Sequence, residues 1–126
     1  MYDGEWQRAA RAVRAEVIGD DGTRTAPPGD PVPAEYQDYL TAMAWGVWAR
    51  GGPLSTRDRS LLVLAMTAAT GRMDEFRIHL RASAGAGVSD DEVIELLYQI
   101  TAYCGAPAGN AARAVIREVR TAREAV

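Results

Sequence analysis

The single histidine of the chain, His79, follows Glu75 by four residues in a stretch whose apolar spacing predicts a helix. Residues four apart on a helix share one face, so the carboxylate and the imidazole are close enough to touch. A neighbouring carboxylate raises the pKa of an imidazole and fixes its tautomer, which suits a general acid or base near neutral pH. The ordinary alternative is a solvated surface pair, and the spacing alone does not decide between the two.

Other charged residues are candidates because of their places in predicted helices. Glu35 begins a helix, where a carboxylate complements the helix dipole, and it joins the chemistry only if the fold brings it near His79. Arg57 and Arg59 occupy a first helical turn, where the dipole disfavours cations, so a local carboxylate or an anionic ligand could offset the cost. Arg72 precedes Glu75 by three residues on the same side. The place of Arg57 and Arg59 in a first turn is weak evidence for an anion site.

The helix that follows Glu35 is rich in aromatic residues: Tyr36, Tyr39, Trp45 and Trp48. Such side chains more often supply core or interface area than a ligand pocket. Cys104, in a mostly apolar helix end, is interpreted as a small buried hydrophobic residue.

Composition excludes several kinds of chemistry. One cysteine cannot form an intrachain disulfide or a CxxC pair, and the absence of lysine removes any Schiff-base mechanism. One histidine argues against metal sites built on several imidazoles, and we predict no metal. Net charge is −3 and the arginines are dispersed, which disfavours nucleic acid as a partner. The longest apolar run is far below the ~20 residues of a membrane span, so we expect a cytoplasmic protein without a membrane partner.

The elements that must position these residues are predicted to be helices throughout. A chain of 126 residues has the length of one domain, and its apolar spacing is helical nearly everywhere. We expect an all-α, compact bundle of about six helices near residues 3–18, 33–50, 57–70, 73–84, 89–104 and 108–123. The third is apolar around most of its circumference and is predicted to be centrally buried. Ser89 with Glu92 matches a capping box, and Ser55 with Asp58 resembles one, with Thr56 as the rival cap.

Six segments, in order and over nearly the whole chain, resemble motifs of the carboxymuconolactone decarboxylase family. They are VRAEVIG at 13–19, EYQDY at 35–39, AWG at 44–46, TRDRSL at 56–61, GRMDEFRIHLR at 71–81 and YCGAPA at 103–108. The resemblance implies a single domain over residues 1–126, a fold shared with the AhpD-type accessory proteins of alkyl hydroperoxide reductase, and a homo-oligomer, commonly a trimer or hexamer. Peroxidase activity is not implied, because the two cysteine positions of the AhpD branch align with Arg72 and Glu75 and its relay glutamate aligns with Ser60.

The reaction that the resemblance implies is cofactor-free loss of CO2 from γ-carboxymuconolactone, which gives the β-ketoadipate enol-lactone in the catabolism of protocatechuate. Such an enzyme must anchor an anion, stabilise developing oxyanion charge and return one proton. The resulting hypothesis makes His79 the proton donor and Glu75 or Glu35 its partner. It assigns substrate contacts as follows: Arg57 or Arg72 as the carboxylate or oxyanion clamp, Trp45 with Tyr39 as walls that exclude water, and Tyr103 as a further binding residue.

Some segments depart from the family pattern. The family's WGEVW is Trp45-Gly46-Val47-Trp48 here, without the acidic residue; Gly85-Ala86-Gly87 replaces an asparagine-rich turn, and Gln99 stands where the family often has histidine. Two alternatives therefore stay open. One is a tailoring enzyme that acts on another lactone or β-keto acid in a biosynthetic pathway. The other is a member without catalysis that binds a small molecule or serves in assembly.

Overall fold

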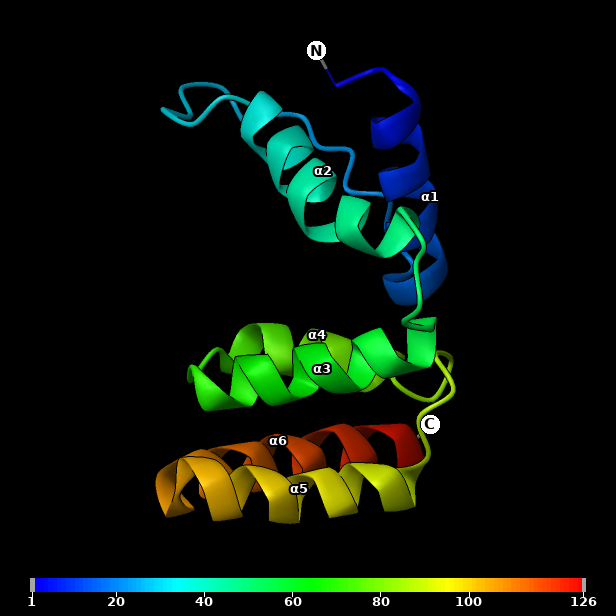
Figure 1. Ribbon diagram of the computed structural model, residues 1–126. Helices are drawn as coiled ribbons and strands as arrows, with labels where there is room; N and C mark the ends of the chain where they lie inside the picture. Colours follow the sequence, from blue (N-terminus) through cyan, green and yellow to red (C-terminus); the bar gives the residue numbers. More distant parts are fainter. Residues whose placement is uncertain (1, 126) are drawn as a thin grey trace. The chain divides into compact units, whose positions relative to one another are not determined.

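The computed structural model describes residues 2–125, which contain six α-helices and no strand (Figure 1). The helices are α1 (Glu5–Ile18), α2 (Glu35–Ala49), α3 (Thr56–Ala69), α4 (Met73–Ala82), α5 (Asp90–Cys104) and α6 (Ala106–Glu124). The all-α class and the six helices are thus confirmed. The contacts group the chain into two units, Met1–Pro53 and Leu54–Val126, and each is described by itself. The single domain over residues 1–126 stays a prediction.

In the first unit, α1 and α2 pack against each other through a close approach at Gly46. The Trp6 indole Nε1 donates a hydrogen bond to the Ala42 carbonyl at 2.9 Å, which lays the ring across α2. A Cβ at Gly46 would overlap that ring. The glycine therefore provides the room that lets α1 lie against α2.

The loop after α1 is fixed at its start by Asp20. Its carboxylate accepts hydrogen bonds from the Arg24 guanidinium at 2.5 Å and from the Gly22 amide at 2.8 Å. The bonds from Arg24, followed by the bond from Gly22, hold the pKa of Asp20 far below its ordinary value. This turn begins a long connection to α2 that the sequence predicts as loop.

In the second unit, the hairpin of α3 and α4 packs on the hairpin of α5 and α6, as Figure 1 shows. Buried apolar side chains from all four helices and from the turn before α5 form the core: Leu64, Phe76, Val88, Ile100 and Ile116. At Gly109 of α6, a Cβ would overlap the Thr101 side chain of α5, so the glycine allows these two helices to approach.

Capping boxes start α3 and α5. Ser55 accepts from the Asp58 amide at 3.1 Å, and Ser89 accepts from the Glu92 amide at the same distance. Each acidic side chain bonds back to the amide of its serine. Both predicted boxes are confirmed, with Ser55 rather than Thr56 as the cap of α3.

Three predictions about elements are wrong. α3 is not centrally buried, since Leu62 and Met66 on one of its sides are 41% and 60% exposed. Cys104 is exposed rather than buried, because it ends α5 next to the turn into α6. α6 begins at Ala106 rather than Ala108, since Pro107 fits the first helical turn, where no backbone N–H is needed.

No helix within residues 2–125 is both long enough and apolar enough to cross a bilayer.

Candidate active site

Helix α4 positions the two residues that the sequence singles out. Phe76 and Leu80 are buried against the core, and Glu75 and His79 each precede one of them by a single residue. His79 is therefore half-buried, with its Nδ1 atom shielded from solvent, whereas Glu75 is exposed. The imidazole thus belongs to a helix whose neighbouring residues, Phe76 and Leu80, are part of the core.

Glu75 and His79 share the same face of α4 but are not bonded to each other. Within residues 2–125, the Glu75 carboxylate forms no hydrogen bond or ion pair. The Asp74 carboxylate beside it binds Arg77 at 3.1 Å instead. Glu75 thus remains available to a ligand or to a rotated imidazole one helical turn away.

The two candidate clamps lie at opposite ends of α3. Arg57 is in the first turn of α3, and Arg72 follows its last turn and precedes α4. A helix of 14 residues is about 21 Å long, so the two arginines cannot hold one small carboxylate together.

The surroundings of these arginines also differ. The Arg57 guanidinium pairs with Glu92 of α5 and lies 3.6 Å from the Asp58 carboxylate. Local carboxylates thus offset its unfavourable place at a helix start. The Arg72 side chain is exposed and, within the described residues, forms no ion pair. Arg72 is the cation that a ligand could recruit without breaking an existing pair.

The remaining candidates are distributed over both units. Tyr103, in the last turn of α5, is 83% exposed. In the first unit, Trp45 is buried and packs on Trp48 with ring centroids 4.9 Å apart. Tyr39 is exposed and lies 6.5 Å from the Tyr36 ring. The structure therefore brings Arg72, Glu75 and His79 onto one helical segment, and it brings Trp45 and Tyr39 onto α2.

Glu35 borders a cavity of about 380 Å³ in the first unit. Its other lining residues come from the chain start, the end of the loop and the first turns of α2: Tyr2, Pro31, Val32, Pro33, Tyr36 and Tyr39. Aromatic rings and proline around one carboxylate give a largely apolar recess with a single charge. Two of the predicted site residues, Glu35 and Tyr39, therefore share a cavity.

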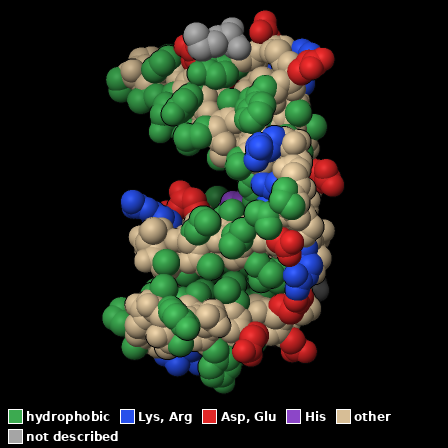
Figure 2. Space-filling view, viewed as in Figure 1, with side chains coloured by type: hydrophobic (Ala, Val, Ile, Leu, Met, Phe, Trp, Pro, Cys, Tyr) green, Lys and Arg blue, Asp and Glu red, His purple; other side chains and the backbone are tan. Residues whose placement is uncertain are grey.

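A larger groove, of about 510 Å³, lies between α3 and α5, and sequence reasoning did not identify it. Figure 2 shows hydrophobic side chains gathered where these helices lie side by side. Its lining is mainly apolar, from Leu54, Leu61, Leu62, Ala65 and Leu96, with Asp58, Glu92, Glu95 and Gln99 at its polar positions. The signal in the sequence is the apolar circumference of α3, which by itself indicates burial rather than a groove. None of the eight predicted site residues lines this groove.

The described residues contain no group of three or more His, Cys, Asp or Glu side chains that could hold a metal ion.

Two comparisons bear on this arrangement. The model of the carboxymuconolactone decarboxylase family matches residues 34–118, a range that includes every predicted site residue. A 4-carboxymuconolactone decarboxylase of Acinetobacter baylyi is 38% identical over 121 residues, which cover 94% of this chain and 90% of that protein.

Proposed function

Because the chain belongs to the carboxymuconolactone decarboxylase family, we propose that it is a cofactor-free carboxy-lyase that converts γ-carboxymuconolactone to its enol-lactone with loss of CO2. The observation that carries this proposal is 38% identity to a 4-carboxymuconolactone decarboxylase over nearly the full length of both chains. The segment from Arg72 to His79 supports it, because Arg72 is the N-cap of α4 and Glu75 and His79 lie in its first two turns, so that a cation, a carboxylate and an imidazole follow one another closely.

The first step of the proposed reaction breaks the bond between the lactone ring and its carboxylate. CO2 leaves, and the electron pair of that bond enters the unsaturated lactone as a dienolate. The protein must hold the substrate anion and stabilise the oxyanion that forms. In this proposal Arg72 is the clamp rather than Arg57, since Arg57 already pairs with Glu92 and Asp58.

The second step returns one proton to carbon. His79 is the proposed donor, because an imidazole titrates near neutral pH and this ring is half-buried and held by α4. Glu75, one turn away, is its proposed partner, and Glu35 is the alternative partner. The electrons of the dienolate form the new C–H bond, so the step needs no oxidant or reductant.

Aromatic side chains complete the proposed site. Trp45, which is buried and packs on Trp48 with the rings tilted, is proposed as an apolar wall, and Tyr39 borders the cavity beside Glu35. Exclusion of water strengthens the electrostatic contacts with the oxyanion. Tyr103 is proposed as an additional substrate contact from the end of α5.

The same proposal extends to the setting of the enzyme. The chain acts in the cytoplasm, in the β-ketoadipate pathway of aromatic catabolism, as a homo-oligomer such as a trimer or hexamer. It has no peroxidase activity, since Arg72 and Glu75 stand where a CxxC pair would be needed.

An ultraviolet assay tests the reaction directly. The protein, dialysed against a chelator, is mixed with γ-carboxymuconolactone generated in situ, while lactone decay and CO2 release are followed together. We expect one CO2 per lactone consumed, without added cofactor. Decay no faster than in a protein-free control would overturn the proposal.

A second candidate function is favoured by the absence of an acidic residue between Trp45 and Trp48. If that residue helps to form the site in relatives, this chain acts on a different lactone or β-keto acid as a biosynthetic tailoring enzyme, or binds such a compound without turnover. Assays with a panel of lactone acids and β-keto acids distinguish these cases. Turnover of a panel member, but not of γ-carboxymuconolactone, would support the tailoring enzyme, and calorimetric binding without turnover would support the ligand-binding member.

A further inference from the structure

The recess beside Glu35 is lined by three of the five tyrosines of the chain. Tyr36 and Tyr39 lie three residues apart at the start of α2, so their rings are neighbours on the helix surface, with centroids 6.5 Å apart. Tyr2 reaches the same recess from the chain start. Tyr36 and Tyr39 are 52% and 47% exposed, so neither ring is used up by the core. Three phenol rings are thus open to a ligand in this recess.

Glu35 is the one charged side chain among the lining residues of the recess. Within residues 2–125, its carboxylate forms no hydrogen bond or ion pair. Asp38, in the same first turn of α2, pairs with Arg11 at 2.9 Å. Glu35 precedes Tyr39 by four residues, so the carboxylate and this ring share one face of the helix. The recess therefore combines an unused negative charge with aromatic rings.

The start of α2 opposes this negative charge only in part. The positive end of a helix dipole amounts to about half an elementary charge. One of the amides at this helix start is already bonded, since the Tyr36 amide donates to the Pro33 carbonyl at 3.0 Å. Glu35 carries a full negative charge at the same place. The recess thus favours a cation over an anion.

The lining of the recess also indicates the kind of cation. The face of an aromatic ring attracts a cation within about 6 Å of its centroid, so rings 6.5 Å apart can both contact one cation. Pro31, Val32 and Pro33 complete the lining, and their side chains accept no hydrogen bond. A bare ammonium or guanidinium group needs several acceptors, whereas a nitrogen that is covered by methyl groups needs none.

We propose that this recess binds a small alkylated ammonium compound, such as a trimethylammonium group on a short carbon chain. The methyl groups pack on the rings of Tyr36 and Tyr39, and the charge lies near the Glu35 carboxylate. The cavity volume of about 380 Å³ is at the small end of the range for ligand cavities, roughly 300–1,000 Å³. Because the side chains that form it are exposed, we expect dissociation constants in the millimolar range.

The inference goes beyond the proposed decarboxylation, whose substrate is an anion. Glu35 repels a carboxylate, so the lactone and the ammonium compound need different sites. With a cation beside Glu35, Glu75 is the partner that serves His79. Both proposals name Glu35 and Tyr39, so the test below relies on Tyr36 as well.

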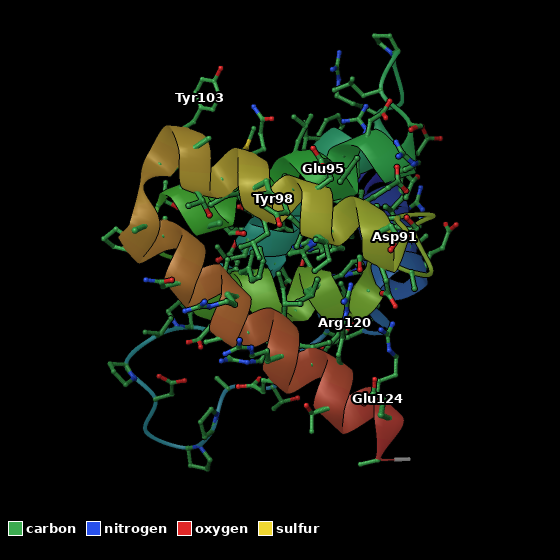
Figure 3. All side chains as sticks on the ribbon, turned by 90° about the horizontal axis from the view of Figure 1, so that it is seen from below. Asp91, Glu95, Tyr98, Tyr103, Arg120 and Glu124 are labelled. Carbon is green, nitrogen blue, oxygen red and sulfur yellow. The ribbon has the colours of Figure 1, made fainter. Side chains whose placement is uncertain are left out.

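The other two tyrosines of the chain provide matched controls. Tyr98 and Tyr103 belong to α5 and are 70% and 83% exposed. Figure 3 shows both on this helix, with the Tyr103 ring projecting away from it. Neither of them lines the groove between α3 and α5. These exposed rings outside the recess should bind an ammonium compound far more weakly than Tyr36 and Tyr39 do.

An NMR titration of the backbone amides with choline tests the site. We expect shifts that saturate at millimolar choline and cluster at residues 31–39, while the amides of Tyr98 and Tyr103 keep their positions. Tyr36→Leu is expected to raise the dissociation constant by about threefold or more, because a ring face is lost, and Tyr36→Phe is expected to keep it near the parent value. Glu35→Gln should also raise it by about threefold or more, since the negative charge is removed. Tyr98→Leu leaves it unchanged.

The tert-butyl isostere of choline, in which carbon replaces the charged nitrogen, separates the effect of charge from that of shape. We expect it to bind more weakly than choline by about threefold or more. Equal affinity for the two compounds would overturn the assignment of a cation, and tighter binding of guanidinium than of choline would overturn the alkylated class.

A parent chain without saturable shifts at residues 31–39 would overturn the site itself. Release of CO2 from γ-carboxymuconolactone, measured on the same samples without choline, reports separately on the proposed reaction. A chain that binds choline in the recess and leaves the lactone intact would contradict the decarboxylase and support the recess.

Discussion

At the residue scale, the proposed chemistry depends on a half-buried imidazole held by one helix. Phe76 and Leu80 fix α4 against the core, so the backbone position of His79 is defined and its side chain is half-buried. Residue types and spacing predict His79 and Glu75 as candidates for the chemistry, and this assignment stays a prediction. They could not show that Glu75 and His79 are unbonded, because the spacing of four residues only makes contact possible.

Substitution of Arg72 and of Arg57 should affect different properties of the protein: substrate affinity for Arg72 and stability for Arg57. Arg72→Ala is expected to raise KM for γ-carboxymuconolactone by about tenfold or more, because a clamp on a carboxylate is lost. Arg57→Ala is expected to lower the free energy of unfolding slightly and to leave KM near the parent value, since it removes the pair between α3 and α5. Steady-state kinetics and urea unfolding of both variants measure this. An increase in KM with Arg57→Ala alone would assign the clamp to Arg57.

Asp20 should make the stability of the chain depend on pH in the acid range. Its pKa is lowered by the bonds from Arg24 and Gly22, so the folded state favours the carboxylate more than the unfolded state does. This stabilisation is present above the ordinary pKa of 3.8 and is lost as pH falls through the lowered value. We expect Asp20→Asn to lower Tm slightly at pH 6, with a difference from the parent that narrows below about pH 4.

The effect of Asp20 should also decrease in high salt, since its side chain is partly exposed to solvent. Glu16→Gln, which removes one exposed carboxylate from α1, is the matched control. A difference between Asp20→Asn and parent that grows as pH falls below 4 would contradict the assigned role.

At the element scale, close approaches of helices depend on single glycines. Gly109 of α6 lies against Thr101 of α5, and a Cβ there would overlap the threonine side chain. We expect Gly109→Ala to lower the free energy of unfolding by about 1–3 kcal/mol, although alanine favours helix. Urea unfolding of this variant measures the change, and Gly85→Ala, whose Cβ would make only ordinary contacts, is the control.

A double variant tests the cause of that destabilisation. Thr101→Ala removes the hydroxyl and methyl groups that a Cβ at Gly109 would overlap. The double variant should therefore lower the free energy of unfolding by less than the sum of the two single variants. If the changes in the free energy of unfolding of the two single variants add up fully in the double variant, overlap with Thr101 is not the cause of the destabilisation by Gly109→Ala.

The elements themselves could be predicted from local signals. The capping boxes at Ser55 and Ser89 involve residues only three apart in the sequence, so local sequence predicts them, and the structure has both. The exposure of Leu62 and Met66 could not be predicted, because an apolar circumference does not say which neighbours cover it. The exposure of Cys104 could not be predicted for the same reason. Whether this residue is buried depends on which neighbours surround the end of α5, rather than on its own polarity.

At the scale of the whole molecule, the residues proposed for the site are distributed over the two units, each of which is described by itself. Arg72, Glu75 and His79 belong to the unit that begins at Leu54, whereas Glu35 and Trp45 belong to the unit that ends at Pro53. Sequence patterns predict each helix from its own residues, but they carry no information on which distant side chains meet. The partnership of Glu35 with His79 is therefore a proposal that kinetics must decide.

The most direct test of the central claim is the rate of γ-carboxymuconolactone decay with the parent chain and with His79→Ala, under identical conditions. We predict that the parent releases one CO2 per lactone and that His79→Ala, with an unchanged circular dichroism spectrum, loses about 10²–10⁴-fold in kcat. A folded His79→Ala variant that turns over near the parent rate would contradict the role of His79 as proton donor. A parent without any turnover would contradict the decarboxylase assignment itself.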